Sequence, residues 1–110
     1  MPAEDVVVIF CTCPPGDARR MARALVDRRL AACVNIVGGV VSIYRWKDQL
    51  EDAGAGVLVL TGTQSGVDEL RRALVELHPY EVPEVVCLDV KDGHEPYWDW
   101  VRASVETGSE

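Results

Sequence analysis

Long hydrophobic segments and basic residues are scarce in this sequence. No apolar run approaches the roughly 20 residues that a membrane-spanning helix requires, so we expect no membrane span. Lysine and arginine total 11 against 18 acidic residues, which gives a formal net charge of -7. Because phosphate binding needs a basic face, this balance argues against a nucleic-acid partner.

Motifs for covalent and phosphate chemistry are also missing. No serine or cysteine lies in a nucleophile-elbow pattern, and neither Gly38-Gly39 nor Gly62-Thr63 belongs to a phosphate-binding loop. The opening residues, Met1–Asp5, contain no basic segment of the kind that begins a signal peptide. We therefore expect a cytoplasmic protein with its cysteines present as reduced thiols, and these absences favour a protein that is not an enzyme.

What the sequence does contain is enough apolar material for one small domain. Its 110 residues are 48% hydrophobic, which predicts a single domain over residues 1–110. A domain of this size leaves much of its surface in water, and association buries more of it. Apolar and β-branched runs predict strands over Val6–Thr12, Cys33–Trp46, Val57–Thr61 and Glu84–Val90. The first run is unbroken, which favours a strand covered on both faces.

Helical spacing of apolar residues predicts three helices, which begin near Ala18, Ser65 and Glu95. Asp68 follows Ser65 by three residues, as in a capping box, and Pro79 ends the second helix. The resulting order is β-α-β-β-α-β-α. Its simplest packing is an α+β fold, a ferredoxin-like split βαβ sandwich with two helices on one face of the sheet and a short C-terminal helix.

The middle hairpin of this fold, Cys33–Thr61, is expected to be unusually long. Gly38-Gly39 interrupts its first arm and predicts a bulge or bend. Its 29-residue span leaves room for arms longer than the ~5–6 residues that are typical of a strand. The overhang carries Ile43, Tyr44, Trp46 and Leu50. An uncovered hairpin is unstable in water, so we expect a neighbouring subunit to cover it. The alternative is that the third helix covers it.

Three cysteines suggest a soft-metal site. Cys11 and Cys13 lie two residues apart on a strand, so they share one face of the sheet. Cys-x-Cys is a possible fragment of such a site, although packed thiols are the simpler interpretation. Cys33 begins the second strand and is expected at the opposite end of the sheet, so that one subunit alone does not gather all three. Cys87 is expected in the core.

A loop with two prolines displays an imidazole, a phenol and two carboxylates. These belong to His78, Tyr80, Glu81 and Glu84. A stiff loop keeps polar groups in position and lowers the entropic cost of binding. His78 and Glu81 are candidate ligands of a divalent ion. Alternatively, His78 interacts with the end of its helix and Tyr80 packs against the body.

Four segments, taken together, are similar to the CutA divalent-cation-tolerance family. They are Leu30–Ile36, Ser42–Trp46, His78–Glu84 and Tyr97–Trp100. They occur in the family's order and spacing, across nearly the whole chain. The resemblance implies a ferredoxin-like subunit and a homotrimer in which the long hairpins pair between subunits. It also implies a role in tolerance of divalent metals, notably copper, and an architecture similar to the PII-type signalling trimers.

The resemblance also implies where a ligand would lie. The family's inter-subunit cleft corresponds to Cys33, Asn35, Tyr44, Trp46, His78, Tyr80 and Glu81. Cys11 and Cys33 match positions at which members carry cysteines discussed as copper ligands. The candidate metal ligands are therefore Cys11, Cys33, His78 and Glu81, with no metal needed for folding.

The sequence departs from the family pattern at several positions. These are Gly38, Asp48-Gln49, Ala55-Gly56 and Gly62. Two functions follow as leading hypotheses, ahead of a cryptic enzyme such as a hydrolase, for which the sequence offers no nucleophile-base pair. The first is a trimeric protein of divalent-metal (copper) response that binds and does not catalyse. The alternative is a PII-like signalling or scaffold trimer that holds a small molecule or a protein partner in its clefts.

Overall fold

The computed structural model describes residues 5–105 and forms one four-stranded sheet with three α-helices in that part of the chain. The elements are β1 (Val6–Cys13), α1 (Ala18–Asp27), β2 (Cys33–Trp46), β3 (Gln49–Thr63), α2 (Val67–Leu77), β4 (Val85–Asp89) and α3 (Glu95–Ser104). The strand order is β2-β3-β1-β4, and all neighbouring strands are antiparallel. The predicted ferredoxin-like split βαβ fold is confirmed.

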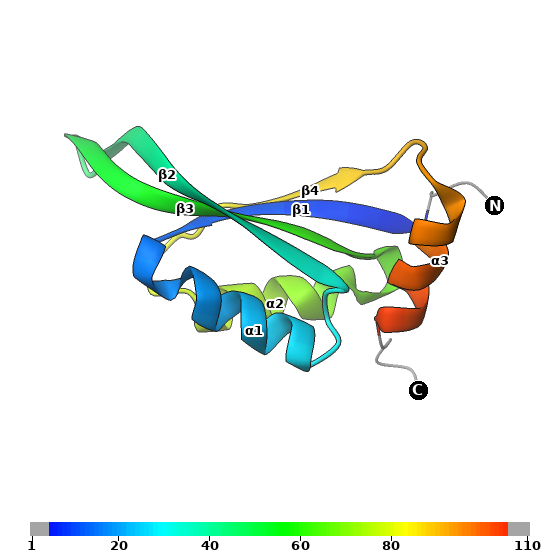
Figure 1. The fold of residues 1–110 in the computed structure, drawn as a ribbon. Coiled ribbons are helices and arrows are strands. Elements are labelled where there is room, and N and C mark those ends of the chain that lie inside the picture. The colour runs from blue at the N-terminus through cyan, green and yellow to red at the C-terminus, as the bar shows by residue number, and fades with distance from the viewer. Residues whose placement is uncertain (1–4, 106–110) are drawn as a thin grey trace.

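The hydrophobic core lies between the sheet and the helices α1 and α2. Figure 1 shows α1 and α2 side by side on the same face of the sheet. The strands contribute Val7, Ile9, Cys11, Cys13, Leu58 and Leu60, all fully buried. The helices contribute Met21, Leu25, Leu70 and Leu74. The apolar stripes that predicted these helices are therefore the surfaces that cover the sheet.

The opposite face of the sheet is apolar but is not covered by α1 or α2. Because side chains alternate along a strand, Val8 and Phe10 point away from the helices. Their partners on β4, Leu88 and Val86, are 46% and 42% exposed. Val59 extends this face across β3. The prediction that the first strand is covered on both faces is therefore not met within one chain.

The hairpin of β2 and β3 extends well beyond the helices (Figure 1). The two strands remain paired out to Trp46 and Gln49, and a register shift between Val37 and Val40 marks the predicted bulge. The turn consists of Lys47 and Asp48, with φ values of 50° and 66°. Left-handed conformations at both central residues match the twist of a hairpin. β3 thus begins at Gln49 and not at Val57, because residues 49–56 continue the ladder with β2.

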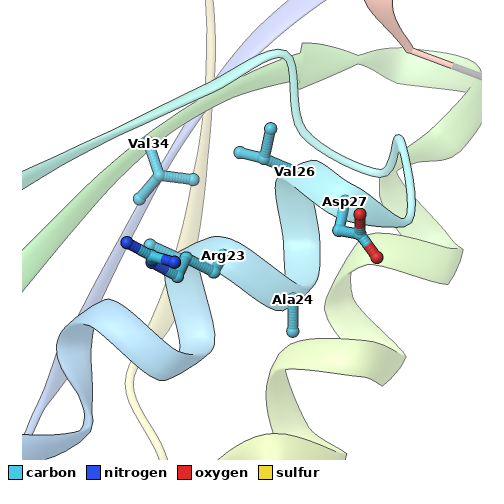
Figure 2. A pocket seen from close by; sticks show the side chains of 6 residues that line it. Arg23, Ala24, Val26, Asp27 and Val34 are labelled. Carbon is cyan, nitrogen blue, oxygen red and sulfur yellow. The ribbon is translucent and has the colours of Figure 1, made fainter.

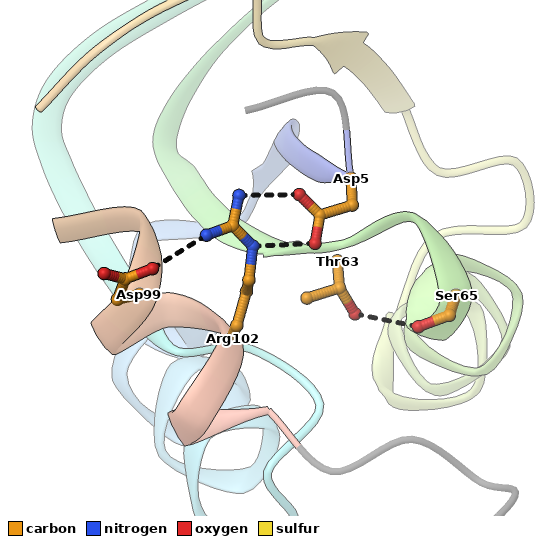
Figure 3. Close-up of polar contacts among 5 residues, drawn as sticks. All are labelled: Asp5, Thr63, Ser65, Asp99 and Arg102. Carbon is orange, nitrogen blue, oxygen red and sulfur yellow. Dashed lines mark hydrogen bonds and ion pairs between the residues drawn. The ribbon is translucent and has the colours of Figure 1, made fainter. Parts of the chain in front are cut away.

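The predicted capping box at the start of the second helix is wrong. A short 3-10 turn, Gln64–Gly66, precedes α2, and no side chain caps the helix. The Ser65 hydroxyl instead lies 3.4 Å from the Thr63 hydroxyl (Figure 3). Asp68 pairs with Arg71 at 2.7 Å. The helix therefore begins at Val67, after a tighter turn.

The third helix packs against one end of the sheet, far from the tip of the hairpin (Figure 1). Arg102 donates two hydrogen bonds to the Asp5 carboxylate, at 2.7 and 2.8 Å, and a third to Asp99 at 3.0 Å (Figure 3). Pro96 lies in the first turn, as predicted. The alternative in which this helix covers the hairpin is therefore wrong. Within residues 5–105 no helix is long and apolar enough to cross a membrane.

Candidate functional site

A cleft of about 630 Å³ lies between the outer half of the hairpin and the loop that follows α2. Its lining consists of Thr12, Ser42, Ile43, Tyr44, Trp46, Ala53, Gly54, Ala55, Pro79, Tyr80, Glu81, Val82 and Glu84. Tyr44 and Trp46 are two residues apart on β2 and share one face of the hairpin. The structure thus brings together Tyr44, Trp46, Tyr80 and Glu81 from the predicted set. Asn35 lies nearer the body of the sheet and is not among the lining residues.

His78 fastens this loop to the sheet. Its side chain is only 7% exposed, and its Nε2 lies 2.7 Å from the backbone carbonyl oxygen of Thr12. The backbone N–H of Tyr80 donates to His78 Nδ1 at 3.1 Å, and the two rings lie 4.8 Å apart. A carbonyl oxygen only accepts, so Nε2 carries the hydrogen. One predicted alternative was that the His78 side chain contacts the end of its own helix. The side chain instead contacts Thr12 of β1.

Sequence reasoning missed Thr12, which holds the loop at both of its ends. Besides accepting from His78, Thr12 donates its hydroxyl hydrogen to Glu84 Oε1 at 3.2 Å. The available signal was a hydroxyl residue near the end of an apolar strand, directly before Cys13 and two prolines. β1 thereby fixes one wall of the cleft.

The charged groups at the mouth of the cleft are exposed. Lys47 Nζ lies 3.8 Å from Glu81 Oε1 and 5.6 Å from the centre of the Trp46 ring. Because both charged side chains are well solvated, this pair contributes little to stability. Burial, the largest cause, raises the pKa of Tyr80, so its phenol stays protonated at neutral pH and is available as a hydrogen-bond donor.

The cysteines of the predicted metal set are separated by the sheet. Cys11 and Cys13 are fully buried beneath the helices, as their shared face predicts. Cys11 pairs with Leu58 and Cys33 with Thr61, so the two thiols are three residues apart along β3. An odd offset places them on opposite faces. The prediction that they lie at opposite ends of the sheet is therefore wrong, and the sheet itself keeps them apart.

Two further observations bear on thiol chemistry. Burial raises the pKa of Cys11 to about 12, with smaller contributions from Cys13 and Glu84, so this sulfur is a thiol at neutral pH. Metal ligation needs the thiolate. Cys87, expected in the core, is exposed because β4 is an edge strand that the helices leave uncovered.

The candidate metal ligands do not form a site within one chain. Among residues 5–105, no three His, Cys, Asp or Glu side chains are grouped so that they could hold a metal ion. Cys11 is buried and protonated, Cys33 lies on the other face, and both His78 nitrogens have backbone partners. Glu81 remains exposed at the mouth of the cleft. The four residues therefore do not fit a shared metal ion in a single subunit.

A second hollow lies between α1 and the start of β2. It is a shallow groove lined by Ala22, Arg23, Ala24, Val26, Asp27 and Val34 (Figure 2). None of the predicted ligand residues contributes to it. The cleft beside the hairpin is therefore the candidate site.

Comparison with known proteins agrees with this architecture. A family model described as "CutA1 divalent ion tolerance protein" matches residues 7–104. The "Divalent-cation tolerance protein CutA" of Thermus thermophilus is 44% identical over 100 residues, which cover 90% of this chain and 95% of that protein. "Protein CutA" of Homo sapiens is 44% identical over 107 residues. These cover 96% of this chain, which spans only 59% of the human protein's length.

A solved structure extends the likeness to three dimensions. The "PII-like protein CutA" of Nostoc sp. PCC 7120, in its apo form, superposes with a TM-score of 0.87 at 32% identity and covers 91% of this chain and 97% of that one. The family description and the name of the Thermus protein refer to tolerance of divalent ions, and none of these names gives a catalysed reaction. With its fold, its hairpin and nearly its whole length matched, this chain belongs to the CutA1 divalent ion tolerance family.

Proposed function

We propose that this chain is a homotrimeric binding protein of the divalent-metal response, and that it binds ligands without catalysing a reaction. Membership of the CutA1 family supports the link to divalent ions. The main support for assembly into a homotrimer is the apolar face of the sheet, which neither α1 nor α2 covers. A cytoplasmic location stays a prediction.

The hairpin supports association independently of that face. Val41, Ile43 and Leu50 share one side of its tip and are 61%, 67% and 72% exposed. An apolar ribbon of this kind is unstable alone and invites pairing. β2 and β4 are both edge strands, so each chain offers two different open edges. Two unlike surfaces on one chain generate a closed ring when the rotation between subunits closes, as in a trimer.

Direct binding of copper or another divalent ion is assigned to the accessible members of the predicted ligand set. These are Cys33, which is partly exposed on the uncovered face, and Glu81, at the mouth of the cleft. Further ligands would come from neighbouring subunits, because residues 5–105 of one chain do not group enough of them. Cys11 and His78 are engaged inside the fold.

Calorimetric titration of the purified assembly with Cu²⁺ tests this assignment. We expect Cys33→Ser to weaken binding by roughly tenfold or more, a loss at least as large as removal of an outer-shell partner causes. Cys87→Ser is the matched control, because it removes an exposed thiol on a different strand, and its affinity should equal that of the unmodified chain. Absence of Cu²⁺ binding, or equal losses in both variants, would contradict the metal assignment.

A second candidate function is supported by the cleft itself. Tyr44, Trp46 and Tyr80 supply aromatic surface, and Glu81 supplies a carboxylate at the rim. Concave, largely apolar sites with a few polar groups are typical of small-molecule binding. In this hypothesis the chain is a PII-like signalling or scaffold protein whose cleft holds a small molecule or a partner tail.

Thermal-shift screening of a metabolite library tests the second candidate. A ligand that stabilises the unmodified chain should lose that effect in Trp46→Ala, which removes the largest aromatic surface of the cleft. His94→Ala, a change at an exposed position outside the lining, is the control. Ligand stabilisation that persists unchanged in Trp46→Ala would place the binding site elsewhere.

A further inference from the structure

We propose that His78 is the positioning residue of the cleft, locked in its Nε2–H tautomer by two backbone partners, and that it is not a metal ligand. The proposal goes against the sequence-based expectation that His78 ligates a divalent ion. It rests on the proposed function only in assigning a binding role to the cleft. The tautomer and the contacts of His78 do not depend on any ligand.

The hydrogen bonds of His78 use both ring nitrogens. Nε2 lies 2.7 Å from the Thr12 carbonyl oxygen, and Nδ1 lies 3.1 Å from the Tyr80 nitrogen. The carbonyl has no hydrogen to give, so Nε2–H donates, and the lone pair of Nδ1 accepts the Tyr80 N–H. A metal ion binds the lone pair of a neutral imidazole nitrogen. It would have to displace the Tyr80 N–H from Nδ1, or remove the Nε2 hydrogen from Thr12.

The surroundings of His78 make either displacement costly. The side chain is 7% exposed, and a buried N–H or carbonyl left without a partner is expensive. The Tyr80 ring lies 4.8 Å from the imidazole, tilted by 46°, and limits access from that side. Metal coordination would therefore break the contacts that order the loop.

What His78 positions is the loop wall of the cleft. Arg20 donates to the carbonyl of Leu77 at 3.2 Å and fixes the end of α2. His78 then donates a hydrogen bond from Nε2 to the Thr12 carbonyl oxygen at the start of the loop. The Thr12 hydroxyl donates to Glu84 Oε1 at the far end of the same loop. Tyr80 and Glu81, which line the cleft, lie between these two attachments. One residue of β1 and one imidazole thus hold the cleft wall in place before any ligand arrives.

The chain carries two histidines, which makes nitrogen NMR a direct test. We expect His78 in the full chain to show a pyridine-like Nδ1 and a protonated Nε2, and to keep both signals when Zn²⁺ is added as a diamagnetic probe. His94 is exposed and serves as the internal reference, with tautomers that average. A protonated Nδ1 in His78, or Zn²⁺-induced shifts of its ring nitrogens while His94 stays unchanged, would overturn the proposal.

Two substitutions separate the two hydrogen bonds. In His78→Asn the side-chain oxygen can replace Nδ1 and keep the Tyr80 N–H bound, whereas in His78→Gln the amide can replace only the Nε2 donor. We expect amide exchange at Tyr80 to be about tenfold faster in His78→Gln and near the unmodified rate in His78→Asn. A role in packing alone predicts equal rates in the two variants, and that result would overturn the proposal. The exchange experiment needs no ligand, so its failure is distinguishable from failure of the proposed cleft function.

Discussion

The two faces of the central sheet have similar apolar composition but very different surroundings. On the helix side, Ile9, Leu58 and Leu60 are completely buried. On the other side, Val86 and Leu88 are nearly half exposed, with Val8, Phe10 and Val59 beside them. A sheet face that is apolar without cover indicates a surface that another molecule buries. Within one chain, only the helix side of the sheet is therefore covered, and we propose that the other side is where a neighbouring subunit packs.

A charge on the uncovered face should have the largest effect. Leu88→Asp places a carboxylate where we expect a neighbouring subunit, and an unpaired charge buried at an interface is strongly unfavourable. We expect this variant to sediment as a folded single chain. Val75→Asp is the matched control, because Val75 is 49% exposed on the helix layer, and it should sediment like the unmodified protein. If Leu88→Asp leaves the assembly intact, the uncovered face is not the interface.

Neighbouring residues on β3 allow the same comparison by cavity formation. Leu60→Ala empties a fully buried position on the helix side and should lower the free energy of unfolding by about 2–5 kcal/mol. Val59→Ala, on the other face, should cost less in stability and mainly raise the dissociation constant of the assembly. Urea unfolding and dilution-series sedimentation measure the two quantities. Identical effects of both variants on association would remove the distinction between the faces.

Cysteine labelling sharpens the comparison without any mutation. Cys11 and Cys13 lie on the helix side with burial as the largest cause of their raised pKa values, so both thiolate population and access are low. Cys87 pairs with Ile9 and so lies on the same face by register, but it is exposed on the edge strand, although burial also raises its pKa. Mass spectrometry after brief alkylation should find Cys87 modified first and Cys11 and Cys13 modified only on unfolding. Rapid labelling of Cys11 in the native protein would contradict the buried assignment.

The smallest effect is expected at the end of the sheet, where α3 is attached. Hydrogen bonds from Arg102 hold the pKa of Asp5 below its ordinary value. A lowered folded pKa means that the stabilisation is present above the unfolded pKa of about 3.9 and is lost as the pH falls through the lowered value. The Asp5 side chain is 52% exposed, so after allowance for solvent screening the pair is worth about 1 kcal/mol or less.

Asp5→Asn tests this attachment by urea unfolding at two pH values. The variant should be slightly less stable than the unmodified chain at neutral pH and equal to it in strong acid. Asp27→Asn, which removes the same charge elsewhere, is the control. A difference that persists unchanged in acid would show that the carboxylate charge of Asp5 is not its source.

Much of the fold was predictable from the sequence because its signals are local. Helical spacing located all three helices, and Gly38-Gly39 correctly predicted the bulge. The early start of β3 was missed, since residues 49–56 are mostly small or polar and lack the apolar pattern of a strand. That pattern reports burial, and this part of the ladder is far from the core. The pairing with β2 that makes it a strand is a tertiary feature.

The candidate site was only partly predictable. Tyr44, Trp46, Tyr80 and Glu81 line one cleft within the single chain, whereas the family resemblance implies a cleft between subunits, which stays a prediction. The role of Thr12 and the positions of Cys11 and Cys33 on opposite faces depend on the register between strands. A register offset of one residue exchanges the faces, and no single segment of sequence contains that information.

The mass of the assembly in solution tests the central claim most directly. Sedimentation equilibrium of the full chain at micromolar concentration measures it without reference to shape. The two-faced sheet and its projecting hairpin predict a single species at three times the 12.1 kDa mass of the chain. A species of 12.1 kDa that persists across the concentration range would contradict the account, because the uncovered face would then have no partner.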